Sequence, residues 1–215
     1  MQQPTHFEPL PYDCVIPCAG LSSRMDGWKP LAEYRGRPLI LSSIENALSA
    51  CQRLVVVTGF RGEELEQLLA AEYPHSPQLQ VIRNGEYTRG MFSSIQTGAA
   101  HINSDWLFVA LGDMPDIPPH LYFQLAERID TAARASTRHD IIRPVFRGKP
   151  AHPVLMNQRV KHTLCKMPAD ANMQKMFMKH AQETGGMVLE VEVYEPGSLY
   201  DIDTAEDLQN PIWEE

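Results

Sequence analysis

Residues 12–29 read YDCVIPCAGLSSRMDGWK, an apolar run that passes directly into a loop of small and basic residues. The run 12–17 is almost continuously apolar, as strands are when a parallel sheet is covered on both faces. Similar runs follow along the chain at 53–58, 79–82 and 106–111. Apolar residues at helical spacing fill the intervals 38–50, 62–72 and 92–101. This alternation predicts an α/β fold with three layers, doubly wound around a mostly parallel sheet.

The second half of the chain is less regular. We expect helices at 118–134, 158–166 and 172–183, strands at 141–145, 153–156 and 187–193, and a helix that opens at Thr204. No internal repeat and no long linker interrupts the chain. We therefore expect a single domain over residues 1–215, in which the proline-rich residues 1–12 form a flexible lead-in.

Composition excludes several classes of protein. The chain has 215 residues, of which 43% are hydrophobic and 21% charged, and its formal net charge is −8. An acidic balance of this size argues against binding nucleic acid or an anionic membrane surface. No apolar run reaches the roughly 18 residues of a membrane span, and the start of the chain does not resemble a secretory signal. The four cysteines lack zinc-site spacing, so we expect reduced thiols and a cytoplasmic protein.

The loop after the first strand combines small residues with the cations Arg24 and Lys29. Small residues let backbone N–H groups approach a phosphate, and the two cations add attraction. The loop lacks the Gly-Lys-Ser/Thr of a Walker A motif and the glycine fingerprint of dinucleotide-binding folds. A plain strand-to-helix turn with solvated charges fits the same residues, so both interpretations stand at this point.

Polar residues also follow the third strand. Asn84 could contact a base or ribose, and Ser94 lies where a helix N-terminus would face the same crevice. The alternative is a simple helix start, with Ser93 and Gln96 as a capping box.

Asp113 follows the most hydrophobic strand directly, where an uncompensated carboxylate is unfavourable. Mg²⁺ shared with the phosphates of a ligand would compensate it, because Mg²⁺ is usually held by one or two carboxylates together with phosphate oxygens. Asp203 could complete that site, although Asp203 with Glu206, or Thr204 with Asp207, also fits a helix cap. His152 stands between prolines, as a structural or a functional histidine.

In order along the chain, these motifs resemble those of the nucleotidyltransferases that build molybdenum-cofactor dinucleotides. The resemblance runs from about Asp13 to Leu208. It rests on Ala19-Gly20-x-Ser22-Ser23-Arg24-Met25-x-x-x-Lys29, Asn84…Gly90-Met91…Ser94, Gly112-Asp113-Met114-Pro115, His152-Pro153 and Asp201-Ile202-Asp203-Thr204-x-Glu206-Asp207.

The resemblance implies a Rossmann-like nucleotidyltransferase fold and a role for each matching residue. Arg24 and Lys29 would bind the triphosphate and, with Asp113, form the catalytic set; Asp113 and Asp203 would hold Mg²⁺. His152 would face the acceptor. The nucleotide would be lined by Ala19, Gly20, Leu21, Thr58, Asn84, Ser94 and Gly112.

Cys18-Ala19-Gly20 is similar to the Ala-Ala-Gly of the cytidylyl-transferring members of this family. The resemblance therefore implies that CMP is moved from CTP to the terminal phosphate of molybdenum-molybdopterin, with release of pyrophosphate, and that a molybdenum hydroxylase could receive the product. A guanylyl- or other nucleotidyltransferase with a different phosphorylated acceptor, and a non-catalytic carrier of nucleotide or cofactor, remain alternatives. Two positions depart from the family pattern, since Asp26 and Ala151 each stand where relatives have Gly.

Overall fold

The first strand, β1 (Leu10–Cys18), lies at the centre of an eight-stranded sheet in a computed structural model that describes residues 8–21, 27–134 and 139–209. The strand order along the sheet is β10-β7-β9-β6-β1-β4-β5, and β8 pairs with β7. The other strands of this sheet are β4 (Cys51–Thr58), β5 (Leu79–Arg83), β6 (Trp106–Val109), β7 (His139–Phe146), β8 (Lys149–Pro150), β9 (Val154–Asn157) and β10 (Met187–Glu192). The three-layer, mostly parallel α/β fold that the sequence predicts is confirmed.

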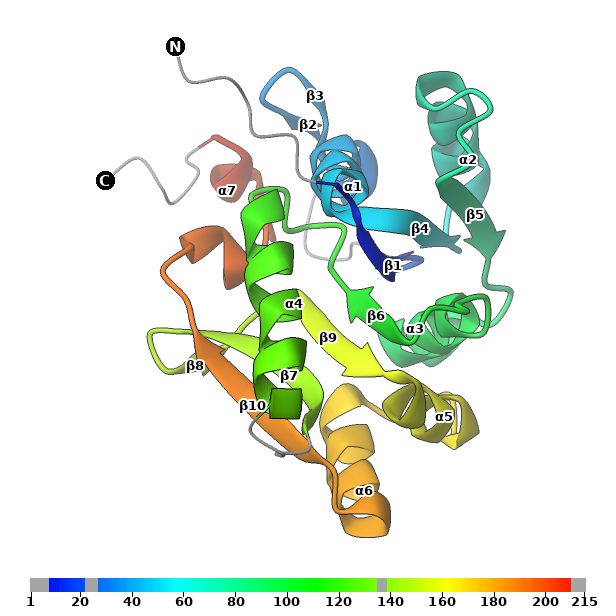
Figure 1. Cartoon of the computed structure of the whole chain (residues 1–215). Coiled ribbons are helices and arrows are strands. Elements are labelled where there is room, and N and C mark those ends of the chain that lie inside the picture. The colour runs from blue at the N-terminus through cyan, green and yellow to red at the C-terminus, as the bar shows by residue number, and fades with distance from the viewer. Residues whose placement is uncertain (1–7, 22–26, 135–138, 210–215) are drawn as a thin grey trace.

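Helices cover both faces of the sheet (Figure 1). One layer packs on the β1 side chains Cys14 and Ile16 and contains α1 (Leu39–Ala50), α2 (Gly62–Glu72) and α4 (Pro119–Arg134). The opposite layer packs on Val15 and contains α3 (Met91–Ala99), α5 (Gln158–Lys166) and α6 (Met173–Thr184). The apolar residues of β1 therefore serve two cores in alternation, as the period of two in a strand requires.

Several boundaries differ from the prediction. β1 begins at Leu10, so residues 10–12 are strand rather than lead-in, whereas residues 1–7 lie outside the described part of the chain. β6 ends at Val109, two residues early, because the chain turns at Leu111 and the Met114 amide donates back to the Leu111 carbonyl.

Three short strands carry no readable sequence pattern. β2 (Glu33–Tyr34) and β3 (Arg37–Pro38) form a separate two-stranded sheet, and β8 is also only two residues long. Strands of two residues are too short to show an alternation of apolar and polar positions. The last helix, α7 (Ala205–Gln209), begins one residue after Thr204.

Chain direction sets which loops can meet. β4, β5 and β6 run parallel to β1, whereas β9 is antiparallel to both β6 and β7. The chain moves from β1 outward to β5, then returns to the other side of β1 as β6. The loops after β1 and β6 therefore diverge at a topological switch point, where open α/β sheets bind their ligands. Among the described residues, no helix has both the length and the apolar character needed to cross a membrane.

Candidate active site

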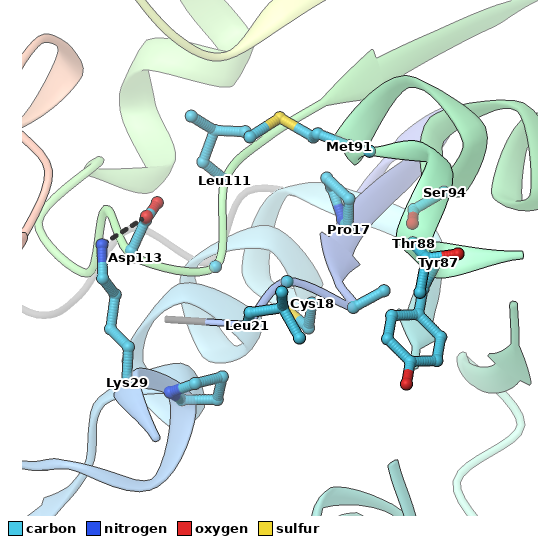
Figure 2. A pocket seen from close by; sticks show the side chains of 15 residues that line it. Pro17, Cys18, Leu21, Lys29, Tyr87, Thr88, Met91, Ser94, Leu111 and Asp113 are labelled. Carbon is cyan, nitrogen blue, oxygen red and sulfur yellow. Dashed lines mark hydrogen bonds and ion pairs between the residues drawn. The ribbon is translucent and has the colours of Figure 1, made fainter. Parts of the chain in front are cut away.

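A cavity of about 330 Å³ opens where β1 and β6 end (Figure 2). Three segments build its wall: the loop after β1, the segment that leads into α3, and the loop after β6. Figure 2 shows Lys29 and Asp113 at one end of the cavity and Tyr87, Thr88 and Ser94 at the other. The lining residues are Pro17, Cys18, Ala19, Gly20, Leu21, Lys29, Pro30, Tyr87, Thr88, Gly90, Met91, Ser94, Leu111, Gly112 and Asp113.

Lys29 links two acidic residues at the first end. It begins the 3-10 helix Lys29–Leu31 and is only 8% exposed. Its ammonium donates to Asp113 Oδ2 at 2.9 Å and to Asp203 Oδ1 at 2.5 Å. Burial alone would lower the pKa of Lys29, but hydrogen bonds and charge from Asp203 and Asp113 raise that pKa above its usual value. Lys29 is therefore a fixed cation at neutral pH.

The backbone brings the two acids together. The Ile202 amide donates to the Asp113 carbonyl at 2.9 Å, and the Ile202 side chain is buried with Tyr34 and Leu39. The expected cap between Thr204 and Asp207 is present: the Asp207 carboxylate accepts from the Thr204 amide at 2.7 Å, and the Asp207 amide donates to Thr204 Oγ1 at 3.2 Å. Asp207 therefore serves the cap, whereas the Asp203 carboxylate contacts Lys29.

Asp201 joins Asp113 and Asp203, which the sequence analysis did not predict. One carboxylate oxygen from each residue lies within 4.8 Å of the others. Burial raises the pKa of Asp201, and the negative charges of Asp203 and Asp113 raise it further. The i, i+2 spacing of Asp201 and Asp203 was an available signal, because such residues share a face in extended chain.

The chemistry of this donor set fits a small divalent cation. Mg²⁺ takes oxygen ligands, and three convergent carboxylates supply them. Within the described part of the chain, the cluster contains three carboxylates but only the one positive charge of Lys29. Binding of a further cation would therefore reduce the repulsion between the carboxylates.

A buried amide organises the opposite end of the cavity. Asn84 Nδ2 donates to Ser93 Oγ at 2.9 Å and to Ser94 Oγ at 3.0 Å, and Asn84 Oδ1 accepts from the Glu86 amide. Asn84 is not a lining residue, whereas Ser94 is. Asn84 therefore acts on the wall of the cavity through its neighbours.

The alternative interpretation of the start of α3, a capping box formed by Ser93 and Gln96, is wrong. Gly90 is the N-cap residue, and Ser93 Oγ donates to the Gly90 carbonyl at 2.8 Å. Gln96 instead donates to the carbonyls of Leu164 and Met167, each at 2.8 Å, which ties α3 to the end of α5.

Thr58 is placed differently from the expectation that it lies beside the nucleotide. It is fully buried, is not a lining residue, and donates through Oγ1 to Glu66 at 2.6 Å. Glu66 also accepts from Arg83, so the Thr58 hydroxyl belongs to a contact between the end of β5 and α2. Its neighbour Gly59 lies closer to the site, since a Cβ there would lie 2.6 Å from Ala19 Cβ and 2.7 Å from Tyr87 Cβ.

The loop after β1 is only partly described, and Arg24 and Asp26 lie outside the described residues. The indole N–H of Trp28 donates to the Gly20 carbonyl at 3.4 Å, which joins the two described ends of the loop. Arg61 stacks over the Trp28 ring, with its guanidinium carbon 5.4 Å from the ring centroid.

His152 precedes β9 at the same edge of the sheet, and Ala151 next to it is buried. The His152 amide donates to the Ser198 carbonyl at 2.7 Å, and the His152–Pro153 bond is cis. Burial lowers the pKa of His152, although a hydrogen bond to the Val109 backbone and the charge of Asp113 oppose that shift. Its Nδ1 atom is buried without a hydrogen-bond partner among the described residues.

Most of the apolar residues in the cavity wall were not predicted from the sequence. Leu21 had been expected at the nucleotide, but Met91, Leu111 and Tyr87 had not. Leu21 and Met91 are each 57% exposed, and both line this cavity. Met91 directly follows Gly90 in the family motif, so its place in that motif was the available signal.

Several known proteins are similar to this chain over most of its length. The molybdenum cofactor cytidylyltransferase of Escherichia coli K12 is 30% identical over 196 residues, which cover 91% of this chain and 92% of that protein. A probable molybdenum cofactor guanylyltransferase of Natronomonas pharaonis is 28% identical over 91% of this chain and 94% of its own length. A manganese complex of Rv0371c from Mycobacterium tuberculosis H37Rv shares the fold, with a TM-score of 0.65, 19% identity and coverage of 93% of this chain and 97% of that one.

The family model for the MobA-like NTP transferase domain matches residues 14–184. That segment contains the cavity, Lys29 and Asp113, whereas Asp201 and Asp203 lie beyond it. The chain is a nucleotidyltransferase and belongs to the MobA-like NTP transferase family.

Proposed function

We propose that this enzyme transfers CMP from CTP to the terminal phosphate of molybdenum-molybdopterin and releases pyrophosphate, with Mg²⁺ as its metal. The observation that carries the proposal is the meeting of Lys29, Asp113 and Asp203 at one end of a cavity that small residues line. The relative from Escherichia coli supports the choice of nucleotide and acceptor. A cytoplasmic location is part of the proposal, because Cys14 and Cys51 are buried free thiols, as is usual in reducing compartments.

The reaction joins two anions, so charge neutralisation and alignment are its main requirements. A phosphate monoester has a second pKa of about 6 and is mostly dianionic at neutral pH. Its oxygen can therefore attack the α-phosphorus of CTP without a general base, while the bond from that phosphorus to the bridging oxygen of pyrophosphate breaks. What the protein supplies is in-line positioning and positive charge.

Each residue has a role in this scheme. Asp113, Asp201 and Asp203 would hold Mg²⁺, which when bound would neutralise charge on the phosphates and on the leaving group. Lys29, with Arg24 from the same loop, would bind the leaving pyrophosphate. Backbone N–H groups of the small residues in the loop would donate hydrogen bonds to the phosphate oxygens. The residues assigned to nucleotide contact are Ala19, Gly20, Leu21, Ser94 and Gly112.

The base is assigned from the floor of the cavity. Ala19 is 4% exposed, and its methyl group narrows the space that a glycine would leave. A narrower floor favours a pyrimidine over a purine, although steric selection of this kind is worth only about 1–3 kcal/mol. One relative is a probable guanylyltransferase, so GTP is the nucleotide against which CTP should be compared.

His152 is assigned to the acceptor. Its lowered pKa keeps the imidazole neutral, so this residue would add no charge beside the acceptor. Val109 pairs with Val154, so His152 precedes β9 at the edge of the sheet where the loop that carries Asp113 begins, which supports this assignment.

The deciding experiment measures pyrophosphate release by the purified protein with Mg²⁺, CTP or GTP, and molybdenum-molybdopterin. We expect release with CTP that depends on the acceptor, and formation of the cytosine dinucleotide. Release with GTP alone would reverse the base assignment, and release only with a sugar or alcohol phosphate would replace the acceptor. Nucleotide binding without any release would favour a carrier, and binding of the product by a molybdenum hydroxylase could be tested next.

A further inference from the structure

The end of the cavity opposite Lys29 and Asp113, where the proposed function places the base, contains the Ser94 hydroxyl, and a buried Asn84 contacts that hydroxyl. Asn84 is 4% exposed, and Ser93 and Ser94 are 4% and 1% exposed. Each polar atom of the Asn84 amide is used, since Oδ1 accepts from the Glu86 amide at 2.9 Å and Nδ2 donates to both serines. The backbone donor at Glu86 fixes which end of the amide is oxygen, because an NH₂ group there would face another donor.

This arrangement determines what the two serine hydroxyls can do. A serine hydroxyl has one hydrogen to donate and two lone pairs. Both Oγ atoms already accept from Asn84, so their own hydrogens point elsewhere. The Ser93 hydrogen goes to the Gly90 carbonyl at 2.8 Å. The Ser94 hydroxyl meets no acceptor among the residues that the structure describes, and Ser94 lines the cavity.

We infer that Asn84 is a positioning residue that makes the Ser94 hydroxyl a hydrogen-bond donor toward the base, so that this end of the site selects a base edge with an acceptor atom. The inference rests on the proposed function and adds to it, because Asn84 would act without touching the nucleotide. O2 and N3 of cytosine are acceptors of the required kind. Figure 2 shows Ser94 beside Tyr87 and Thr88, at the far end of the cavity from Lys29 and Asp113.

The test reverses the polarity of this contact. In Asn84→Asp, one carboxylate oxygen still accepts from the Glu86 amide, but the other can only accept from the serines. The Ser94 hydrogen would then turn back toward residue 84, and lone pairs would face the base. We expect the Kd of Mg²⁺-CTP, measured by titration calorimetry, to rise about tenfold, the order expected for one net hydrogen bond.

Inorganic tripolyphosphate with Mg²⁺ is the matched control ligand, since it reports only on the phosphate end. Its Kd should stay within twofold of wild type in Asn84→Asp. Ser93→Ala is the matched control variant, because Ser93 Oγ accepts a hydrogen bond from the same Asn84 amide but Ser93 does not line the cavity. It should bind CTP within about twofold of the wild-type protein.

A double-mutant cycle separates positioning from a general structural role. Ser94→Ala should weaken CTP binding by a similar factor, and adding Asn84→Asp to it should weaken binding no further. Additive losses, an equal loss for tripolyphosphate, or unchanged CTP binding in Ser94→Ala would overturn the inference. If Asn84→Asp does not fold, the Kd values of Mg²⁺-CTP for Ser94→Ala and Ser93→Ala are compared. Equal Kd values for these two variants would overturn the inference. Failure of the wild-type protein to bind CTP would instead remove the proposed function and this inference together.

Discussion

The Lys29 ammonium lies 2.5 Å from Asp203 Oδ1, although 174 positions of sequence separate the two residues. The contact joins the loop after β1 to the segment before α7, and the second bond of Lys29 to Asp113 adds the loop after β6. A buried lysine tolerates this position because two carboxylates surround it. Three segments that are distant in sequence thus share one charged cluster.

Asp113→Asn should lower the rate of pyrophosphate release at least 100-fold and weaken Mn²⁺ binding. The substitution keeps the size of the side chain but removes one of the three carboxylates that lie within 4.8 Å. The metal can be followed directly by electron paramagnetic resonance. Glu206→Gln is the control, since Glu206 is an exposed acid three residues after Asp203 that lies outside the cluster. Wild-type turnover in Asp113→Asn would remove the metal assignment.

Lys29→Met should raise the KM for CTP by about tenfold or more, because charge-assisted bonds to phosphate are lost. It should also lower the melting temperature, since Asp113 and Asp203 lose their shared cation. Steady-state kinetics and thermal unfolding give the two readouts. A variant with unchanged KM but reduced stability would show that Lys29 only balances the acids.

Gly59→Ala should destabilise the protein by about 1–3 kcal/mol and weaken CTP binding. A Cβ at this position would lie 2.6 Å from Ala19 Cβ and 2.7 Å from Tyr87 Cβ, so the two walls of the cavity would be forced apart. Gly85→Ala is the matched control, because a Cβ there meets nothing within 4 Å. Equal denaturant midpoints and CTP affinities for the two variants would contradict the prediction.

Tyr34→Phe should cost about 1.5–3 kcal/mol of unfolding free energy, the range for a hydrogen bond to a charged group. The Tyr34 hydroxyl donates to Asp116 Oδ2 at 2.6 Å, and Tyr34 is only 1% exposed. Arg35 bonds the same carboxylate at 3.0 Å from an exposed position, so Arg35→Gln should cost less. Urea unfolding of both variants measures the difference, and the reverse order would refute the argument.

His152→Gln should flatten the dependence of stability on pH below neutrality. Burial lowers the pKa of His152 in the folded protein, so between its unfolded value of about 6.5 and the lower folded value the unfolded chain binds more protons. The wild-type protein therefore loses stability as pH falls through this window, by up to about 1.4 kcal/mol per pH unit more than the variant. Unfolding curves at pH 5 to 8 test this, and parallel profiles would contradict it.

Much of the framework could be predicted because it depends on local pattern. The apolar runs that became β1, β4 and β6 are long enough to show burial on both faces, and the spacing in α2 and α5 gave their ranges directly. The hairpin of β2 and β3 could not be predicted, because strands of two residues have no period. The antiparallel direction of β9 could not be predicted either, because the direction of a strand depends on the path of the chain that precedes it.

The order of residues along the chain is enough to show that acids and cations follow the strands of a parallel sheet, and the residues after parallel strands meet at one edge. Which of those side chains turn into the cavity depends on the packing of the folded chain. Thr58 turns away to Glu66 and Asn84 to two serines, whereas Asp201 turns in beside Asp113. The position of a side chain along the chain is a local property, but its direction is set by packing against residues that are distant in sequence.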